Sequence, residues 1–158
     1  MLLDSTHLFT KIMDDYDSLL ENFDWSMFRP IFQRLTDIDT NRLEDEMQKL
    51  PSRYSDYHTL CIKAKKQADE ENRVLAELTA DLGNKASAEL PRNAQKATAK
   101  NVENYIFANT DYNNQVQRVN DAQERYLTLK GLVNALELKK DMLVQLNANR
   151  RAETKLYN

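Results

Sequence analysis

The side chains with the clearest chemical potential are the cations between residues 85 and 100. Lys85, Arg92, Lys96 and Lys100 occur there with a single acidic residue, Glu89. Lysine and arginine neutralise phosphate oxygens, so a cluster of this kind favours binding to a polyanion such as nucleic acid. The pattern is equally typical of solvated lysines on an ordinary loop, and both interpretations stay open at this point.

Residues that could perform catalysis or hold a metal lack the motifs that such chemistry needs. Neither His7 nor His58 has an adjacent nucleophile or acid motif, and the aspartates of 14–17 and 37–39 lack the glycine and final glutamate of an EF-hand. The single cysteine, Cys61, excludes an intrachain disulfide and a four-thiolate zinc site. We therefore expect a non-enzymatic protein with no metal and no cofactor.

Composition indicates a helical protein. The chain has 158 residues, of which 30% are charged, with only two glycines and three prolines. Residues 1–50 carry eleven acidic and five basic side chains, whereas residues 51–158 carry fourteen and seventeen. No apolar run approaches the roughly 20 residues needed to span a bilayer, and no secretory leader is apparent. We expect a cytoplasmic protein.

Two long apolar stripes predict the elements that must position the cations. Residues 52–82 have mainly apolar side chains at alternating spacings of three and four, and residues 97–149 have them mostly at spacings of three, four or seven, as on one face of a helix. The members are Tyr54, Tyr57, Cys61, Ala64, Ala68, Glu71, Leu75, Leu78 and Leu82, then Val102, Tyr105, Tyr112, Val116, Val119, Ala122, Tyr126, Leu129, Val133, Leu136, Leu143 and Leu146. These patterns predict an all-α fold, a long antiparallel coiled-coil-like hairpin.

Several breaks divide this hairpin. Gly83-Asn84 is a candidate helix cap, so we expect a basic loop over 83–96, and Leu50-Pro51 predicts a kink or break. Within the second helix, Asn109 is either a buried amide on the stripe or part of a break at 109–111, with Thr110 as the cap of a new helix. The hairpin domain is predicted to cover residues 37–158.

An acidic, aromatic helical module is predicted over residues 1–36. Its large apolar side chains include Phe23, Trp25, Phe28 and Phe32. They either fold back as a cap on the bundle or, ringed by acidic groups, bind a partner protein with a basic surface.

The hairpin also has more apolar surface than two helices can cover. The surplus residues off the second stripe are Leu127, Leu132, Leu138, Met142 and Val144. Further helices, from the amino-terminal module and from other subunits, are expected to cover them, so we predict a homo-oligomer.

The order and spacing of several weak signals resemble a known family. These signals are Ile38-Asp39-Thr40, Leu43, Tyr54-Ser55-Asp56-Tyr57, Lys63, Lys65, Lys66, Gly83, Lys100-Asn101-Val102-Glu103, Leu129-Lys130, Ala135-Leu136, Lys139 and Met142. From Ile38 to Arg151 the chain resembles the bacteriophage recombination mediators of the UvsY type. Those are small helical proteins that bind single-stranded DNA as ring-like oligomers and load the phage recombinase.

The resemblance implies a non-catalytic recombination mediator in the cytoplasm of an infected bacterial host. Its partners would be single-stranded DNA, the phage recombinase and a single-strand-binding protein, with no membrane contact. The expected phosphate contacts are Lys63, Lys66, Arg73, Lys85, Arg92, Lys96 and Lys100. Family members place basic residues just before the glycine that ends the first long helix, and here only Arg73 is equivalent. The alternative is a helical adaptor or scaffold that binds protein alone, through the module of residues 1–36.

Overall fold

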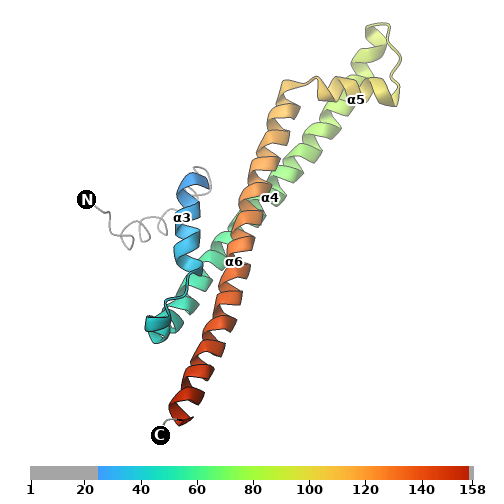
Figure 1. Ribbon diagram of the computed structural model, residues 1–158. Helices are drawn as coiled ribbons and strands as arrows, with labels where there is room; N and C mark the ends of the chain where they lie inside the picture. The colour runs from blue at the N-terminus through green and yellow to red at the C-terminus, as the bar shows by residue number, and fades with distance from the viewer. Residues whose placement is uncertain (1–24, 157–158) are drawn as a thin grey trace, which may run out of the picture. The chain divides into compact units, whose positions relative to one another are not determined.

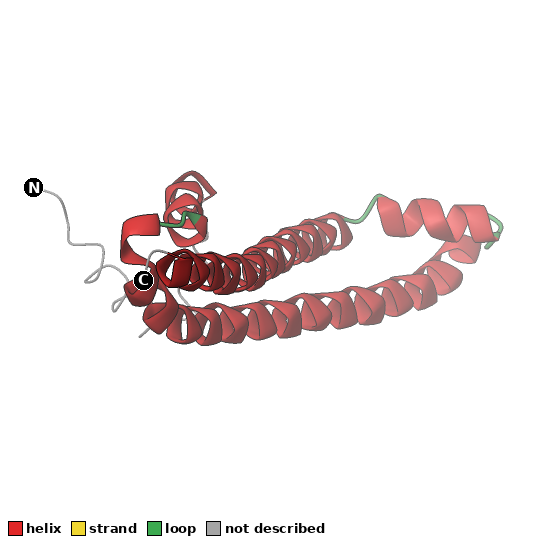
Figure 2. Cartoon of the chain, turned by 60° about the horizontal axis from the view of Figure 1, so that its bottom comes forward, coloured by secondary structure: helices red, strands yellow, loops and turns green. Residues whose placement is uncertain are grey.

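The computed structural model describes residues 25–156, and this part of the chain contains only helices and short connections (Figures 1 and 2). The helices are α3 (Trp25–Thr36), the short 3₁₀ helix η1 (Thr40–Arg42), α4 (Leu43–Arg92), α5 (Ala99–Phe107) and α6 (Thr110–Leu156). The long helices α4 and α6 pack antiparallel, which confirms the all-α class and the pairing of two long helices. Every residue of the two predicted stripes is buried or half-buried.

Of the kink or break predicted at Leu50-Pro51, the break is wrong, because α4 continues through this proline. Proline removes one helical hydrogen bond and crowds the preceding turn. Leu50 and Tyr57 are only 6% and 4% exposed, and their burial holds this part of α4 in place. Packing on both sides of Pro51 therefore outweighs its local preference.

The predicted helix end at Gly83 and the loop over 83–96 are also wrong. The helix α4 extends to Arg92, and Gly83 has no left-handed backbone conformation. Glycine inside a helix costs only about 1 kcal/mol relative to alanine. Ala86 and Leu90 extend the buried stripe from Leu82 at spacings of four, so the helix gains burial by continuing. The connection before α5 shortens to residues 93–98.

The predicted helix over 97–149 is interrupted, and the alternative break near residue 109 is confirmed. The helix α5 ends at Phe107 and α6 begins at Thr110. The Asn109 side chain accepts a hydrogen bond from the Tyr112 backbone N–H at 3.1 Å, so it caps α6. Asn109 is therefore the helix cap, not a buried amide on the stripe, and Thr110, the predicted cap, is instead the first residue of α6.

The chain divides into two compact units that share both long helices. Unit 1 comprises Met1–Ile62 and Leu127–Asn158, and unit 2 comprises Lys63–Tyr126. Both units thus contain part of α4 and part of α6. The boundary at residue 36, expected from composition, stays a prediction.

The core of unit 1 consists mainly of leucines from α3, α4 and α6. Its buried residues are Leu35, Leu43, Leu50, Tyr57, Leu60, Leu129, Leu132, Val133, Leu136, Lys139 and Leu143. Leu132 was expected among the surplus apolar residues, but it is fully buried. The Lys139 ammonium lies 2.9 Å from the Leu35 carbonyl oxygen and 2.6 Å from that of Asp37, and so holds the end of α3 against α6.

The core of unit 2 is lined by smaller side chains. Its buried residues are Ala64, Ala68, Leu82, Ala86, Leu90, Ile106, Gln115 and Ala122. The Gln115 amide donates hydrogen bonds to the Glu71 backbone oxygen at 3.0 Å and to its carboxylate at 2.6 Å. This polar link accommodates Glu71, the one charged member of the first predicted stripe.

Candidate nucleic-acid interface

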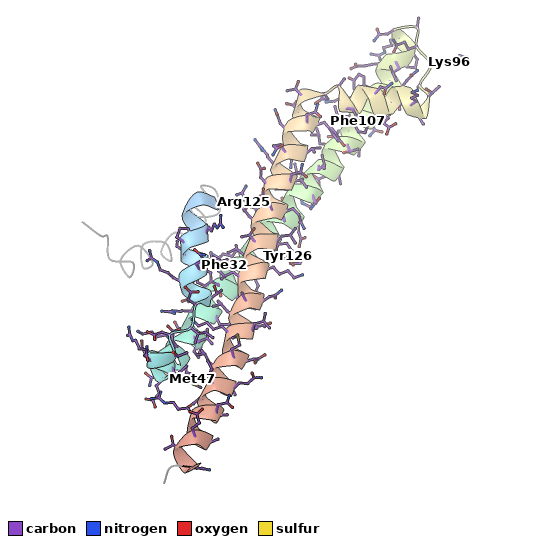
Figure 3. All side chains as sticks on the ribbon, viewed as in Figure 1. Phe32, Met47, Lys96, Phe107, Arg125 and Tyr126 are labelled. Carbon is purple, nitrogen blue, oxygen red and sulfur yellow. The ribbon has the colours of Figure 1, made fainter. Side chains whose placement is uncertain are left out.

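Four of the predicted phosphate-binding residues lie at one end of unit 2, and we call Lys85, Arg92, Lys96 and Lys100 the tip cluster. All four side chains are exposed, and none forms an ion pair with another described residue. Lys85 and Arg92 are seven residues apart on α4, which places them on the same face of that helix. Lys96 lies in the connection before α5, where Figure 3 labels it, and Lys100 lies in the first turn of α5.

Hydrogen bonds fix the backbone that carries the tip cluster. The helix α4 ends in a Schellman-type cap, in which Gln95 N–H donates to the Leu90 carbonyl at 2.9 Å and Ala94 has φ of 56°. The Thr98 side chain then caps α5, and the Asn101 side-chain amide donates to the Lys96 carbonyl at 2.8 Å. The cations therefore extend from a defined connection.

The acidic residue within the tip region is engaged by a neighbouring tyrosine. The Tyr105 hydroxyl on α5 donates to the Glu89 carboxylate on α4 at 2.8 Å, and this bond raises the pKa of Tyr105. The bond attaches α5 to the end of α4. The charge of Glu89 therefore lies beside Tyr105, and the four cations of the tip cluster outnumber it.

The other three predicted phosphate contacts lie elsewhere on α4. Arg73 forms ion pairs with Glu70, at 2.6 Å, and with Glu77, and the hydrogen bond from Arg73 lowers the pKa of the Glu70 carboxyl. Lys63 and Lys66 are exposed. Lys63 lies 22 residues before Lys85, about 33 Å along a helix. The structure thus does not join these three residues to the tip cluster, and their role stays a prediction.

The predicted partner-binding aromatics are only partly described. Phe23 lies outside the described residues, and Trp25 and Phe28 lie in α3 without described side chains. Phe32 is half-buried on α3 (Figure 3). A partner-binding role for this set stays a prediction.

Within unit 2, the tip cluster has one clear chemical capacity. Four cations on a fixed backbone can hold several phosphates of a nucleic-acid strand. No family model, curated protein or solved structure matches the chain. The resemblance to the UvsY-type mediators therefore stays a prediction.

An exposed aromatic side chain, Phe107, was missed as a candidate. Its side chain at the end of α5 is 52% exposed, and its ring centroid lies 5.7 Å from that of Tyr112 (Figure 3). Phe107 follows Lys100 by seven residues, so the two share a face of α5. The seven-residue spacing is present in the sequence, but Phe107 does not belong to the apolar stripe that predicts the helix.

Unit 1 carries a separate apolar groove between α4 and α6. Its volume is about 390 Å³. Its walls are Met47, Leu50, Pro51, Tyr54, Leu136, Glu137, Lys140, Leu143 and Val144. The Tyr54 hydroxyl donates to the Glu137 carboxylate at 2.8 Å, which ties the two helices together at the groove.

The residues considered for catalysis have packing contacts where they are described. The His58 ring stacks on Tyr54 with 5.6 Å between centroids, and Cys61 is half-buried, which raises the pKa of its thiol. His7 lies outside the described residues. Across residues 25–156, no cluster of three His, Cys, Asp or Glu side chains could hold a metal ion. Over the same range, no helix has the length and apolarity to cross a membrane.

Proposed function

We propose that the protein is a non-catalytic phage recombination mediator that binds single-stranded DNA and loads or stabilises a recombinase on it. The observation that carries the proposal is the tip cluster, with four exposed cations on one fixed end of unit 2. The resemblance between residues 38 and 151 and the UvsY-type mediators supplies the recombinase and a single-strand-binding protein as partners. The proposed setting is the cytoplasm of an infected bacterial cell.

Binding through the tip cluster would be mainly electrostatic. Each phosphate that a cation neutralises releases a counterion. For single strands, each such contact makes the affinity fall by about 0.7 logarithmic units for every tenfold rise in salt concentration. Four contacts would give a slope of about −3 in a plot of log affinity against log salt. A whole-chain charge of −3 does not prevent this, because the positive charge is concentrated locally.

The proposal is tested by binding to a labelled oligothymidylate at several salt concentrations. The double variant Lys96→Gln/Lys100→Gln loses two phosphate contacts. At 0.1 M salt each contact contributes about 0.7 logarithmic units of affinity, so the variant should bind about 25-fold more weakly than the parent. Arg150→Gln/Arg151→Gln is the matched control, because it removes two exposed charges from unit 1. Absent or salt-independent binding, or an equal loss in both variants, would reject the proposal.

Homo-oligomerisation is part of the same proposal. Leu127, Leu138 and Met142 are 54%, 66% and 54% exposed, and helical periodicity places them on one face of α6 in unit 1. Such side chains are typical of a surface that another helix covers. Copies assembled in this way would present several tip clusters to one DNA strand and gain affinity by multivalency. Light scattering beside the binding assay gives the subunit number.

A protein-only adaptor is the second candidate function, and the apolar groove of unit 1 favours it. A substitution in the groove separates the two candidates. Val144→Asp places a charge on a wall residue of the groove that is 54% exposed, and it leaves the tip cluster unchanged. Loss of partner-protein binding in this variant, with no DNA binding by the intact chain, would favour the adaptor.

A further inference from the structure

The helix α5 uses one face for packing and leaves the other open. Ile106 is 9% exposed, and the Tyr105 hydroxyl donates a hydrogen bond to Glu89. These two residues therefore hold α5 against the rest of unit 2. The remaining face carries Lys100, Asn104 and Phe107, all exposed, at spacings of four and three. This face combines a cation, an amide and an aromatic ring.

Phe107 is unusual among the exposed large apolar side chains of residues 29–155. The others are Ile62, Leu127, Leu138, Met142 and Val144, which all belong to unit 1. Phe107 is the aromatic member of this set, and it belongs to the unit that carries the tip cluster. The exposed ring of Phe107 and the exposed cations of the tip cluster therefore belong to the same unit.

The surroundings of Phe107 hold its backbone in place. The Asn113 side-chain amide donates to the Phe107 carbonyl at 3.0 Å, and Asn109 caps the next helix. The Tyr112 ring lies against that of Phe107 at an interplanar angle of 38°. A ring supported on one side and open on the other is suited to stacking with a further flat group.

We propose that Phe107 is a base-stacking platform for single-stranded DNA, whose phosphates are held by Lys96 and Lys100. Seven residues of helix separate Lys100 from Phe107, about 10 Å, so one short stretch of strand can contact both. Every base has an aromatic face, so the contact would tolerate any sequence. This inference rests on the proposed function and deepens it, because it adds recognition of the bases to recognition of the phosphates.

The test compares three substitutions of Phe107 in the full-length chain. Phe107→Ala and Phe107→Leu remove the aromatic face, whereas Phe107→Tyr keeps it. We expect the first two to weaken oligothymidylate binding roughly 5- to 150-fold, the range for one stacked base, and Phe107→Tyr to bind like the parent. A purely apolar contact would instead be retained by leucine, and that result would overturn the inference.

Two further readouts separate stacking from a general structural role. An abasic oligonucleotide should bind the parent and Phe107→Leu equally, because neither protein has a base to stack. The salt slope should stay unchanged in Phe107→Leu and become shallower by about 1.4 in Lys96→Gln/Lys100→Gln. A changed slope in Phe107→Leu, or an equal loss of affinity for the abasic strand, would contradict stacking.

The outcomes also distinguish this inference from the proposed function. A parent protein that binds no single-stranded DNA would overturn both. If the parent binds, the lysine variant loses affinity and Phe107→Leu does not, the proposed function survives and the stacking inference fails. Circular dichroism compares the helical content of each variant with that of the parent. Equal content shows that a substitution in α5, which has nine residues, has not unfolded the rest of the chain.

Discussion

Unit 1 and unit 2 use the same two helices, α4 and α6, but bury different side chains between them. Unit 1 buries large residues, among which Leu132 and Leu136 are fully inaccessible. Unit 2 buries several alanines, including Ala68 and Ala86. A buried leucine contributes about 1.5–3 kcal/mol and an alanine much less, so unit 1 supplies most of the hydrophobic stabilisation.

The buried polar side chains of α6 also differ between the two units. Unit 1 contains the charge of Lys139, 2% exposed, and unit 2 contains the neutral amide of Gln115, 6% exposed. The Lys139 ammonium donates to the Leu35 and Asp37 carbonyls, and it forms an ion pair with the Glu46 carboxylate at 2.7 Å. This buried charge joins three elements, whereas the Gln115 amide joins only two. We infer that unit 1 is the stable base, the unit that contributes more to the free energy of unfolding. Unit 2, which carries the tip cluster, contributes less.

The largest expected effect is at Lys139. Replacing it with alanine leaves the Glu46 carboxylate, whose side chain is 18% exposed, without its nearest cation and frees two carbonyls at the end of α3. We expect the free energy of unfolding to fall by about 3 kcal/mol, the lower end of the usual cost of breaking a buried ion pair, because Arg53 stays 3.8 Å from the Glu46 carboxylate. Urea denaturation followed by circular dichroism measures the loss.

The neighbouring lysine provides the control for that experiment. Lys140 is exposed, and its ammonium lies 3.5 Å from the Asp141 carboxylate. Such a surface pair contributes little, so Lys140→Ala should change the free energy of unfolding by less than about 1 kcal/mol. Equal effects at Lys139 and Lys140 would show that the buried contacts of Lys139 do not stabilise unit 1.

A smaller effect is expected at Gln115 in unit 2. Gln115→Ala removes two hydrogen bonds to Glu71, whose carboxylate is half-buried and can recover part of the loss by binding water. We expect a loss of about 1–2 kcal/mol, measured by the same denaturation. Gln117→Ala is the matched control, because Gln117 is exposed and its amide donates to the Asp121 carboxylate within α6. A loss at Gln115 as large as that at Lys139 would contradict the assignment of unit 1 as the stable base.

Periodicity in the sequence was sufficient to predict the helical class and the buried faces. Residues such as Ala64, Ala122 and Leu136 are buried as their spacing requires. Helix ends were harder to predict, because Pro51 and Gly83 have local preferences that tertiary packing overrides. The stripe continues through Ala86 and Leu90 in the sequence, but Gly83-Asn84 has the residue types of a helix cap, so the two local signals conflict.

The site was predictable only in part, and for a different reason. The local excess of cations over residues 85–100 identified Lys96 and Lys100, because charge clustering is a local property of the chain. The burial of Lys139 depends on carbonyls about 100 residues earlier in the chain, at the end of α3, so no local pattern indicates it. Whether a given aromatic such as Phe107 is exposed likewise depends on which face of α5 packs, and the sequence alone did not fix the start of that helix.

The smallest expected effect is a gain in stability at the tip of unit 2. Ala94 has φ of 56°, in the left-handed region, where an alanine side chain crowds the backbone. Ala94→Gly relieves this crowding, partly offset by the greater freedom of glycine in the unfolded chain, so we expect a gain of about 0.5–1 kcal/mol. Ala88→Gly, an exposed helical position of α4, should instead lose about 1 kcal/mol. Opposite signs at the two positions would show that the end of α4, and with it the placement of Arg92 and Lys96, is set by local backbone geometry. A loss at both positions would show that the Schellman-type cap does not form in solution.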